Sequence, residues 1–396
     1  MHVFPDGREA VFIGKPVGAE SSRDHLYVID VSTGSTRRIA NGISIPHNWN
    51  FPMAVTADGN SVLFDFPAGN LHRIVTARRN GSDEIRILFT LTSTPATLDA
   101  GSDGSVYVDL SDRPAEVVRY SSASGDAERF PLPNALRTED TVNFRIVPLP
   151  DRRVLVATRV AGRGQIMAVE VGRDAVPFVA TDQESGGPIA MVGRDHVAFM
   201  VGTIPNQAIA LATTADGRMT GQLKGVDVTN IEALAGSIDG STIFYVVGGV
   251  VWAVPTSGGE PRKITAGSQI AVDPNGRDLI ILRTQTAGSR LVRVPVAGGA
   301  EQPVLLPQGT ALGPEFGSNS VGPDGRIALR LTPKDNWFWP AAIFDPRSFR
   351  LTMIPGGDAA DLQSPGWDSE GRLVMSSWLM RSSLWRFSPI AGLDAK

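Results

Sequence analysis

The sequence predicts an all-β fold assembled from repeated four-stranded antiparallel sheets, and three observations support this prediction. A turn resembling Pro-Asp-Gly recurs along the whole chain. Each turn is followed by a short apolar strand, and then by two further strands joined by a second glycine turn. No segment combines the apolar period of about 3.6 residues with the capping residues that mark a helix, so helices should be scarce.

The recurring turn first appears in FPDGREAVFIG, at residues 4–14. Clear copies follow at 55–66, 100–110, 235–246, 271–282, 321–331 and 367–377, and weaker ones at 148–158 and 191–201. Seven turns contain a glycine: Gly7, Gly59, Gly104, Gly240, Gly276, Gly325 and Gly371. Their average spacing of roughly 45 residues is in the range typical of propeller blades.

Within each repeat unit, the residue types fit short strands and tight turns. The strand before each Asp-Gly turn is brief, as in FPMAV at 51–55, which suits an inner strand near a crowded axis. Asp-Gly and Gly-Gly adopt the positive φ angles that two-residue hairpins require. The last two strands are clearest in HLYVIDVSTGSTRRIA at 25–40 and RLVRVPVAGGAEQPVLL at 290–306. Their Val, Ile, Leu and Tyr residues favour a pleated, half-buried surface.

This fixed order of four strands predicts a β-propeller, in preference to a two-domain β-sandwich or barrel protein. We expect a single domain over residues 1–396, with repeat units that start near 1, 51, 96, 144, 188, 231, 268, 315 and 364. The first unit has almost no inner strand and the ninth lacks a fourth strand. Since propellers usually complete one blade from two distant chain segments, eight blades are preferred, with seven to nine possible.

Composition excludes several classes of protein. The formal net charge of -4 and the lack of long basic runs argue against nucleic-acid binding. The chain has no cysteine, which excludes disulfides, thiol catalysis and thiolate metal sites. No apolar run is long enough to cross a bilayer, so no membrane insertion is expected. The N-terminus lacks the layout of a signal peptide. We expect Met1 to be either a trimmed boundary or a shortened inner strand, with a longer parent chain, such as one carrying a kinase domain, before it.

The repeats also carry a family resemblance. The Pro-Asp-Gly turn, the apolar strand and the segments LYVIDVSTG and LVRVPVAGG resemble the WD-like repeats of TolB-type propellers. Similar units occur in the extracytoplasmic sensor domains of some bacterial Ser/Thr kinases and in the propellers of prolyl-oligopeptidase and tricorn-type peptidases. The resemblance implies a propeller fold, a bacterial source and a periplasmic or extracytoplasmic location. It implies little about activity, because a common fold hosts many functions.

The predicted strand order separates two faces. We name the strands A to D from the axis outward. The A–B and C–D turns are short and share one face, whereas the B–C and D–A connections form the opposite face, here called the long-loop face. The longest segments fall there, including 41–50, 133–143, 307–319, 332–340 and 377–383. Variable loops on a rigid frame are where function usually lies.

Aromatic and polar side chains in these loops form a candidate recognition surface. The candidate ligand- or partner-binding residues are His47, Trp49, Asn50, Trp337, Trp339, Trp378 and Arg381. Exposed tryptophans with a nearby arginine suit a protein, peptide or glycan ligand. The alternative is that these rings pack between neighbouring blades and bury area.

Oxygen ligands near the predicted axis suggest a weaker possibility. Asn143, Glu232 and Glu315 lie before or within inner strands, where they would hold calcium, as in propeller lactonases, if they converge. Otherwise they line a solvated channel. No other cofactor is expected.

The sequence therefore favours a non-catalytic propeller that binds a ligand or protein through the long-loop face, as a sensor or scaffold. The alternative is an enzyme, a metal-dependent hydrolase or lactonase with its site at the central channel mouth. No Gly-x-Ser-x-Gly motif, phosphate loop or local histidine cluster supports catalysis, and no catalytic residue is assigned.

Overall fold

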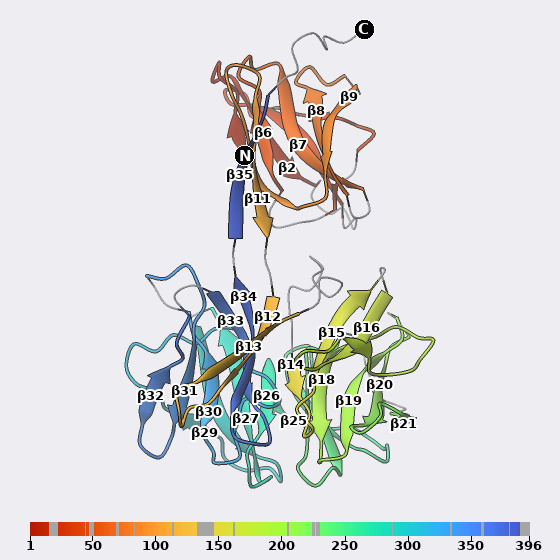
Figure 1. Cartoon of the computed structure of the whole chain (residues 1–396), viewed down its shortest axis with the longest axis vertical. Coiled ribbons are helices and arrows are strands. Elements are labelled where there is room, and N and C mark those ends of the chain that lie inside the picture. The colour runs from red at the N-terminus through yellow and green to blue at the C-terminus, as the bar shows by residue number, and fades with distance from the viewer. Residues whose placement is uncertain are drawn as a thin grey trace. The chain divides into compact units, whose positions relative to one another are not determined.

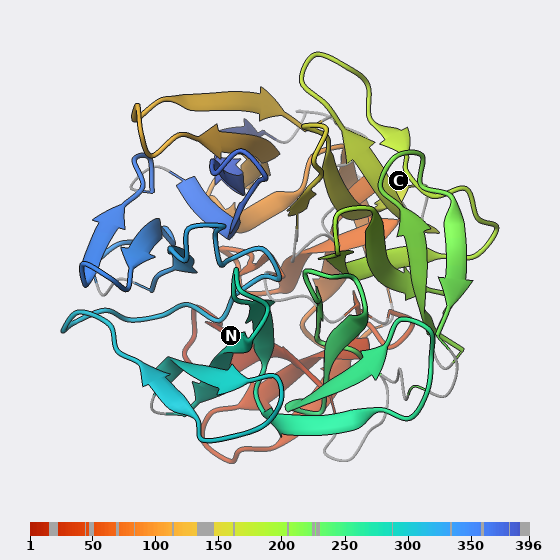
Figure 2. The same ribbon diagram turned by 90° about the horizontal axis from the view of Figure 1, so that it is seen from below.

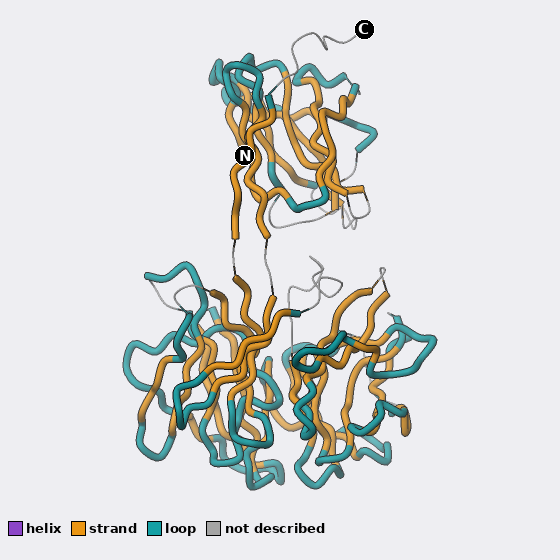
Figure 3. Tube along the Cα trace, viewed as in Figure 1, coloured by secondary structure: helices purple, strands orange, loops and turns teal. Residues whose placement is uncertain are grey.

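The computed structural model (Figure 1) describes most of the chain. The described residues are 1–15, 23–43, 45–46, 51–68, 71–82, 84–112, 115–132, 146–160, 163–203, 206–223, 226, 230–286, 288–332, 335–357, 360–379 and 381–388. Four candidate residues lie outside these ranges: His47, Trp49, Asn50 and Asn143. Strands, turns and loops make up the described part of the chain, where no helix occurs, as Figure 3 shows. The all-β prediction is confirmed.

The chain forms two compact units. Met1–Arg113 and Met380–Lys396 form the first, called the terminal unit, and Pro114–Leu379 form the second, called the propeller unit. Each unit has its own hydrophobic clusters. The chain is thus divided where one domain over residues 1–396 was expected. Repeats in a sequence report the pattern within each sheet, but they do not report which sheets share one core.

Six sheets make up the described part of the propeller unit, arranged around a central axis (Figure 2). From the inner to the outer strand, the first four are β14 (Ile146–Pro148), β15 (Val154–Val160), β16 (Arg163–Val169) and β17 (Val176–Pro177); β18 (Ser185–Val192), β19 (His196–Val201), β20 (Ala208–Thr213) and β21 (Met219–Gln222); β22 (Ala233–Gly236), β23 (Thr242–Val247), β24 (Val250–Pro255) and β25 (Arg262–Ala266); and β26 (Gln269–Val272), β27 (Asp278–Gln285), β28 (Gly288–Pro295) and β29 (Gln302–Val304).

The other two sheets of this unit differ from the regular pattern. The fifth contains β30 (Ile327–Arg330), β31 (Ala341–Asp345) and β32 (Arg350–Met353), and the sixth β33 (Ala360–Trp367), β34 (Leu373–Leu379), β12 (Ala115–Tyr120) and β13 (Ala127–Pro131). In the fifth sheet, bridges from Leu312 to Leu331 and from Val321 to Ile327 replace a regular inner strand.

The sixth sheet joins two distant parts of the chain. Its β12 pairs antiparallel with β34, with Val117 opposite Ser376. Two strands thus come from residues 115–131 and two from residues 360–379. Pairing of this kind completes a blade from separate segments and leaves fewer open edges. The expected mode of closure is present, although the segments are not those at the ends of the chain.

Three sheets make up the described part of the terminal unit. They contain β1 (His2–Val3), β2 (Glu9–Gly14), β3 (Arg23–Asp30) and β4 (Thr36–Ile39), with β5 (Ile45–Pro46) paired to β3; β6 (Met53–Val55), β7 (Ser61–Ala68), β8 (Leu71–Arg78) and β9 (Ile85–Leu91); and β10 (Pro95–Ala100), β11 (Val106–Asp112) and β35 (Arg381–Phe387). With the six of the propeller unit, the described residues form nine sheets, so the preferred count of eight blades is not confirmed.

The Asp-Gly turns form as predicted. In the third sheet of the propeller unit, the Asp239 carboxylate accepts the backbone N–H of Ser241 at 3.0 Å, and Gly240 has a φ of 75°. The equivalent turn of the fifth sheet repeats this arrangement with Asp324, which accepts the N–H of Arg326 at 3.1 Å. The aspartate fixes the turn while the glycine supplies the positive φ. No helix in the described part of the chain is long and apolar enough to cross a membrane.

Candidate functional site

The most distinctive part of the long-loop face is the loop between β30 and β31, the B–C connection of the fifth sheet. Trp337 lies on this loop with 80% of its surface exposed. Trp339, two residues later, is half-buried. The two tryptophans of one short loop therefore have different environments.

Backbone hydrogen bonds fasten this loop to the neighbouring sixth sheet. The N–H of Trp339 donates to Asp361 Oδ1 at 2.9 Å, and the N–H of Leu362 donates to the carbonyl of Trp339 at 2.9 Å. Asn336 adds a side-chain bond from Nδ2 to the carbonyl of Gly357 at 3.0 Å. Because the loop is held on both sides of Trp337, the exposed ring is presented from a fixed backbone.

A buried ion pair supports the same loop. Arg330 pairs with Glu315, and their side chains are 5% and 14% exposed. The guanidinium carbon of Arg330 lies 3.4 Å from the ring centroid of Trp339, a close cation–π contact. Burial lowers the pKa of Arg330, while the nearby carboxylates of Glu315 and Asp361 oppose that change. The pair therefore links the loop to the centre of the propeller unit.

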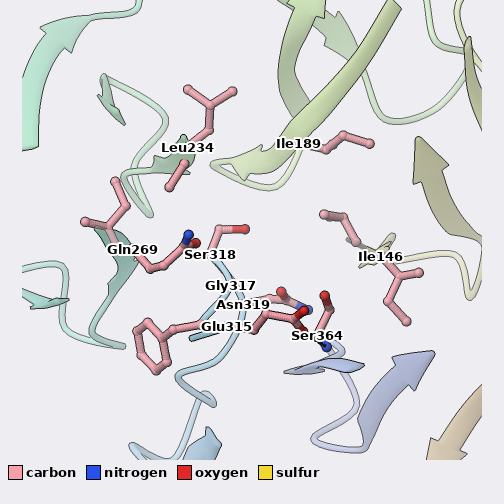
Figure 4. Close-up of a pocket in the computed structure, with 13 residues that line it drawn as sticks. Ile146, Ile189, Leu234, Gln269, Glu315, Gly317, Ser318, Asn319 and Ser364 are labelled. Carbon is pink, nitrogen blue, oxygen red and sulfur yellow. Dashed lines mark hydrogen bonds between the residues drawn. The ribbon is translucent and has the colours of Figure 1, made fainter. Parts of the chain in front are cut away.

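A small cavity of about 20 Å³ lies at this centre (Figure 4). All six sheets contribute to its lining, with Ile146 from β14, Ile189 from β18, Leu234 from β22, Gln269 from β26, Glu315, Phe316, Gly317, Ser318 and Asn319 from the segment before β30, and Ser364 from β33. A volume of this size holds about one water molecule. The described cavity is therefore too small for an organic substrate.

The polar groups at the cavity are largely engaged with one another. Glu315 accepts the backbone N–H of Ser364 at 3.1 Å as well as the Arg330 guanidinium. Ser364 has a φ of 48°, a left-handed conformation that is costly for serine, and this hydrogen bond helps to hold it. Gln269 Oε1 and Asn319 Nδ2 are buried without a hydrogen-bond partner among the described residues, which suits a bridging water.

The weak metal candidates separate in the structure. Glu315 lines the cavity and is paired with Arg330. Glu232, just before β22, accepts the N–H of Gly249 at 3.3 Å in the β23–β24 turn and is not among the lining residues. Within the described residues, no group of three or more His, Cys, Asp or Glu side chains is placed to hold a metal ion.

The remaining recognition candidates also have different environments. Trp378, in β34, is half-buried and packs against the cluster that contains Phe130 and Val374, as the packing alternative expects. Arg381 begins β35 in the terminal unit and is exposed. The structure thus brings Trp337, Trp339 and Glu315 into one connected region, whereas Trp378 belongs to a blade interface.

Arg330 and Asp361 are the residues of this region that sequence reasoning missed. A signal for Arg330 does exist, since it is the one charged residue in the apolar segment IALRL at 327–331. A charge within a buried strand usually requires a partner. Asp361 carries no comparable signal, because its role depends on the path of a loop from another sheet.

Comparison with known proteins identifies the fold. No protein-family model and no curated protein sequence matches the chain. A putative TolB from Agrobacterium tumefaciens is similar in structure, with a TM-score of 0.53 and 11% identity over 68% of this chain and 99% of that one. The chain thus contains a β-propeller. More specifically, the propeller is TolB-like, which confirms the predicted resemblance at the level of the fold.

Two further solved structures are more distant. TolB from Acinetobacter baumannii gives a TM-score of 0.38 at 13% identity, over 97% of this chain and 83% of that one. A catalytically inactive virginiamycin B lyase from Staphylococcus aureus, solved with quinupristin, gives 0.36 at 13% identity, over 93% and 99%. Similarities this weak carry no argument about function.

Proposed function

We propose that this chain is a non-catalytic binding module that recognises a protein or peptide, or alternatively a glycan, through the long-loop face of its propeller unit. Trp337 is the central contact. The observation that carries the proposal is its 80% exposure on a loop fastened to a neighbouring sheet. An exposed tryptophan on a fixed backbone offers a large contact area at a low cost in conformational entropy.

The neighbouring groups support a binding role over a catalytic one. Glu315, the candidate carboxylate nearest the axis, is committed to Arg330 and to the N–H of Ser364. The cavity that it lines holds about one water molecule. No observation on the described residues favours the metal-dependent hydrolase or lactonase. The sensor or scaffold role and the extracytoplasmic location stay predictions.

Peptide and glycan arrays probed with the whole chain test this proposal. We expect Trp337→Ala to weaken each array hit by about 30-fold, the effect of removing a strong hot spot. Phe349→Ala is the matched control. It removes an exposed aromatic ring (52%) from the turn between β31 and β32, on the opposite face of the same sheet.

Binding constants of the hits, measured by calorimetry, give the result. Loss of affinity in Trp337→Ala but not in Phe349→Ala supports the proposal. Hits that bind both variants as tightly as the unmodified chain would show that Trp337 is not the contact.

A further inference from the structure

The sheet β10–β11–β35 of the terminal unit ends in an open edge. Its third strand, β35, pairs with β11 through an unbroken ladder, from Val106 opposite Phe387 to Asp112 opposite Arg381. Among the described residues no strand pairs with the other edge of β35. The two other sheets of the unit have a fourth strand at this position, β4 and β9. The backbone groups of this edge are therefore available to a further strand.

Large apolar side chains are exposed along the same strand. Leu384 is 73% exposed and Trp385 is 53% exposed. As neighbours in a strand they project from opposite faces of the sheet. The indole N–H of Trp385 donates to Ser383 Oγ at 2.9 Å, which satisfies the polar group of the ring within the strand itself. What remains exposed is mostly apolar surface on both faces.

Other outer strands carry features that discourage pairing with another chain. Strand β25 contains Arg262 and Lys263, β29 contains Pro303, and β17 has two residues, one of them a proline. Strand β9 is apolar, but its ladder is interrupted by a bulge opposite Ile74 and Val75. Charges, prolines, short length and bulges all protect edges. Strand β35 has seven residues, an unbroken ladder and no proline.

We propose that β35 pairs antiparallel with β35 of a second copy of this chain, in a register centred on Leu384. The sequence RSSLWRF is self-complementary in that register. Leu384 lies opposite Leu384 of the second copy, and the small Ser383 lies opposite the large Trp385. Arg381 lies opposite Phe387, which allows a cation–π contact. The two three-stranded sheets then form one continuous sheet across a twofold axis.

Charge favours this arrangement over the adjacent register. A shift by one residue would place Arg381 directly opposite Arg386 of the second copy, which is destabilising. In the centred register no like charges are opposite each other. Arg386 is also neutralised within its own chain, since Nη2 lies 2.5 Å from Asp103 Oδ2 and Nε donates to Ser105 Oγ at 3.1 Å. Because the strand matches its own copy, the inference names a second chain and not an unrelated peptide as the occupant.

Cysteine substitution tests the register directly, because the chain contains no cysteine. In Leu384→Cys, the two introduced thiols lie opposite each other with Cα atoms about 5 Å apart, within the range of a disulfide. In Ser382→Cys, the equivalent atoms lie about 13 Å apart along the paired strands, which is too far. Both positions are exposed, so neither substitution threatens the fold.

Mild oxidation at micromolar concentration should convert Leu384→Cys into a disulfide-linked dimer and leave Ser382→Cys unlinked. Light scattering of the unmodified chain should give twice the 42.1 kDa chain mass, and Leu384→Lys should give the monomer mass. A monomer at every concentration would overturn the proposal. Equal cross-linking of the two cysteine variants, or a dimer that survives Leu384→Lys, would also overturn it.

Discussion

Arg330 and Glu315 show how single residues position the proposed binding loop. The guanidinium lies under the ring of Trp339, and the carboxylate accepts the N–H of Ser364 at the central cavity. Such a buried pair adds little net stability compared with apolar residues of the same size. Its effect is on geometry, because each partner must keep the other in place. Removal of one partner leaves the other charge buried and unpaired.

The substitution Arg330→Met should therefore lower the free energy of unfolding by about 3–5 kcal/mol, the usual cost of breaking a buried pair. The double variant Arg330→Met, Glu315→Leu should recover most of this loss, since no charge is then left buried. Urea denaturation followed by tryptophan fluorescence measures both. A single variant as stable as the unmodified chain would show that the pair is not buried in solution.

At the residue scale, the sequence could predict part of the candidate site. Glu315 was identified because it precedes an inner strand, where polar groups face the axis. Trp337 and Trp378 could not be distinguished, since both follow apolar strands and belong to long connections. The structure separates them through packing, which places Trp378 against the cluster around Phe130 and leaves Trp337 exposed. Burial of this kind depends on neighbouring sheets and not on the local sequence.

Strands and turns are the scale at which the sequence is most informative. Each Asp-Gly turn requires a positive φ at glycine and a side-chain acceptor at aspartate, and both are local properties. The pairing of β12 with β34 is different, because it joins residues 115–120 with residues 373–378. No short-range pattern encodes which distant strands meet, so the repeats predicted sheets but not the division of the chain into two units.

The pairing of β12 with β34 gives a prediction about closure of the propeller unit. Val117 is fully buried in β12, an interior strand with neighbours on both sides. Val117→Pro should cost at least about 3 kcal/mol more than Val117→Ala, because proline removes a ladder hydrogen bond as well as the packing of the side chain. Urea denaturation of the two variants gives the comparison. Equal stabilities would mean that this ladder does not close the ring.

At the scale of the whole molecule, the chain combines a TolB-like propeller with a second compact unit built from both of its terminal segments. The proposed recognition loop, its supporting ion pair and the central cavity all belong to the propeller unit. The proposed self-pairing strand, β35, belongs to the terminal unit. On this account, ligand recognition and self-association are properties of different units.

The measurement that tests the central claim most directly is ligand binding by residues 114–379 alone. The unit contains its own hydrophobic clusters and the complete sheet that joins β12 to β34, so it should fold without the terminal unit. Calorimetric titration with a peptide or glycan from the arrays should give a dissociation constant within about twofold of the whole chain. A folded 114–379 fragment, confirmed by circular dichroism, that does not bind the ligand would contradict the account.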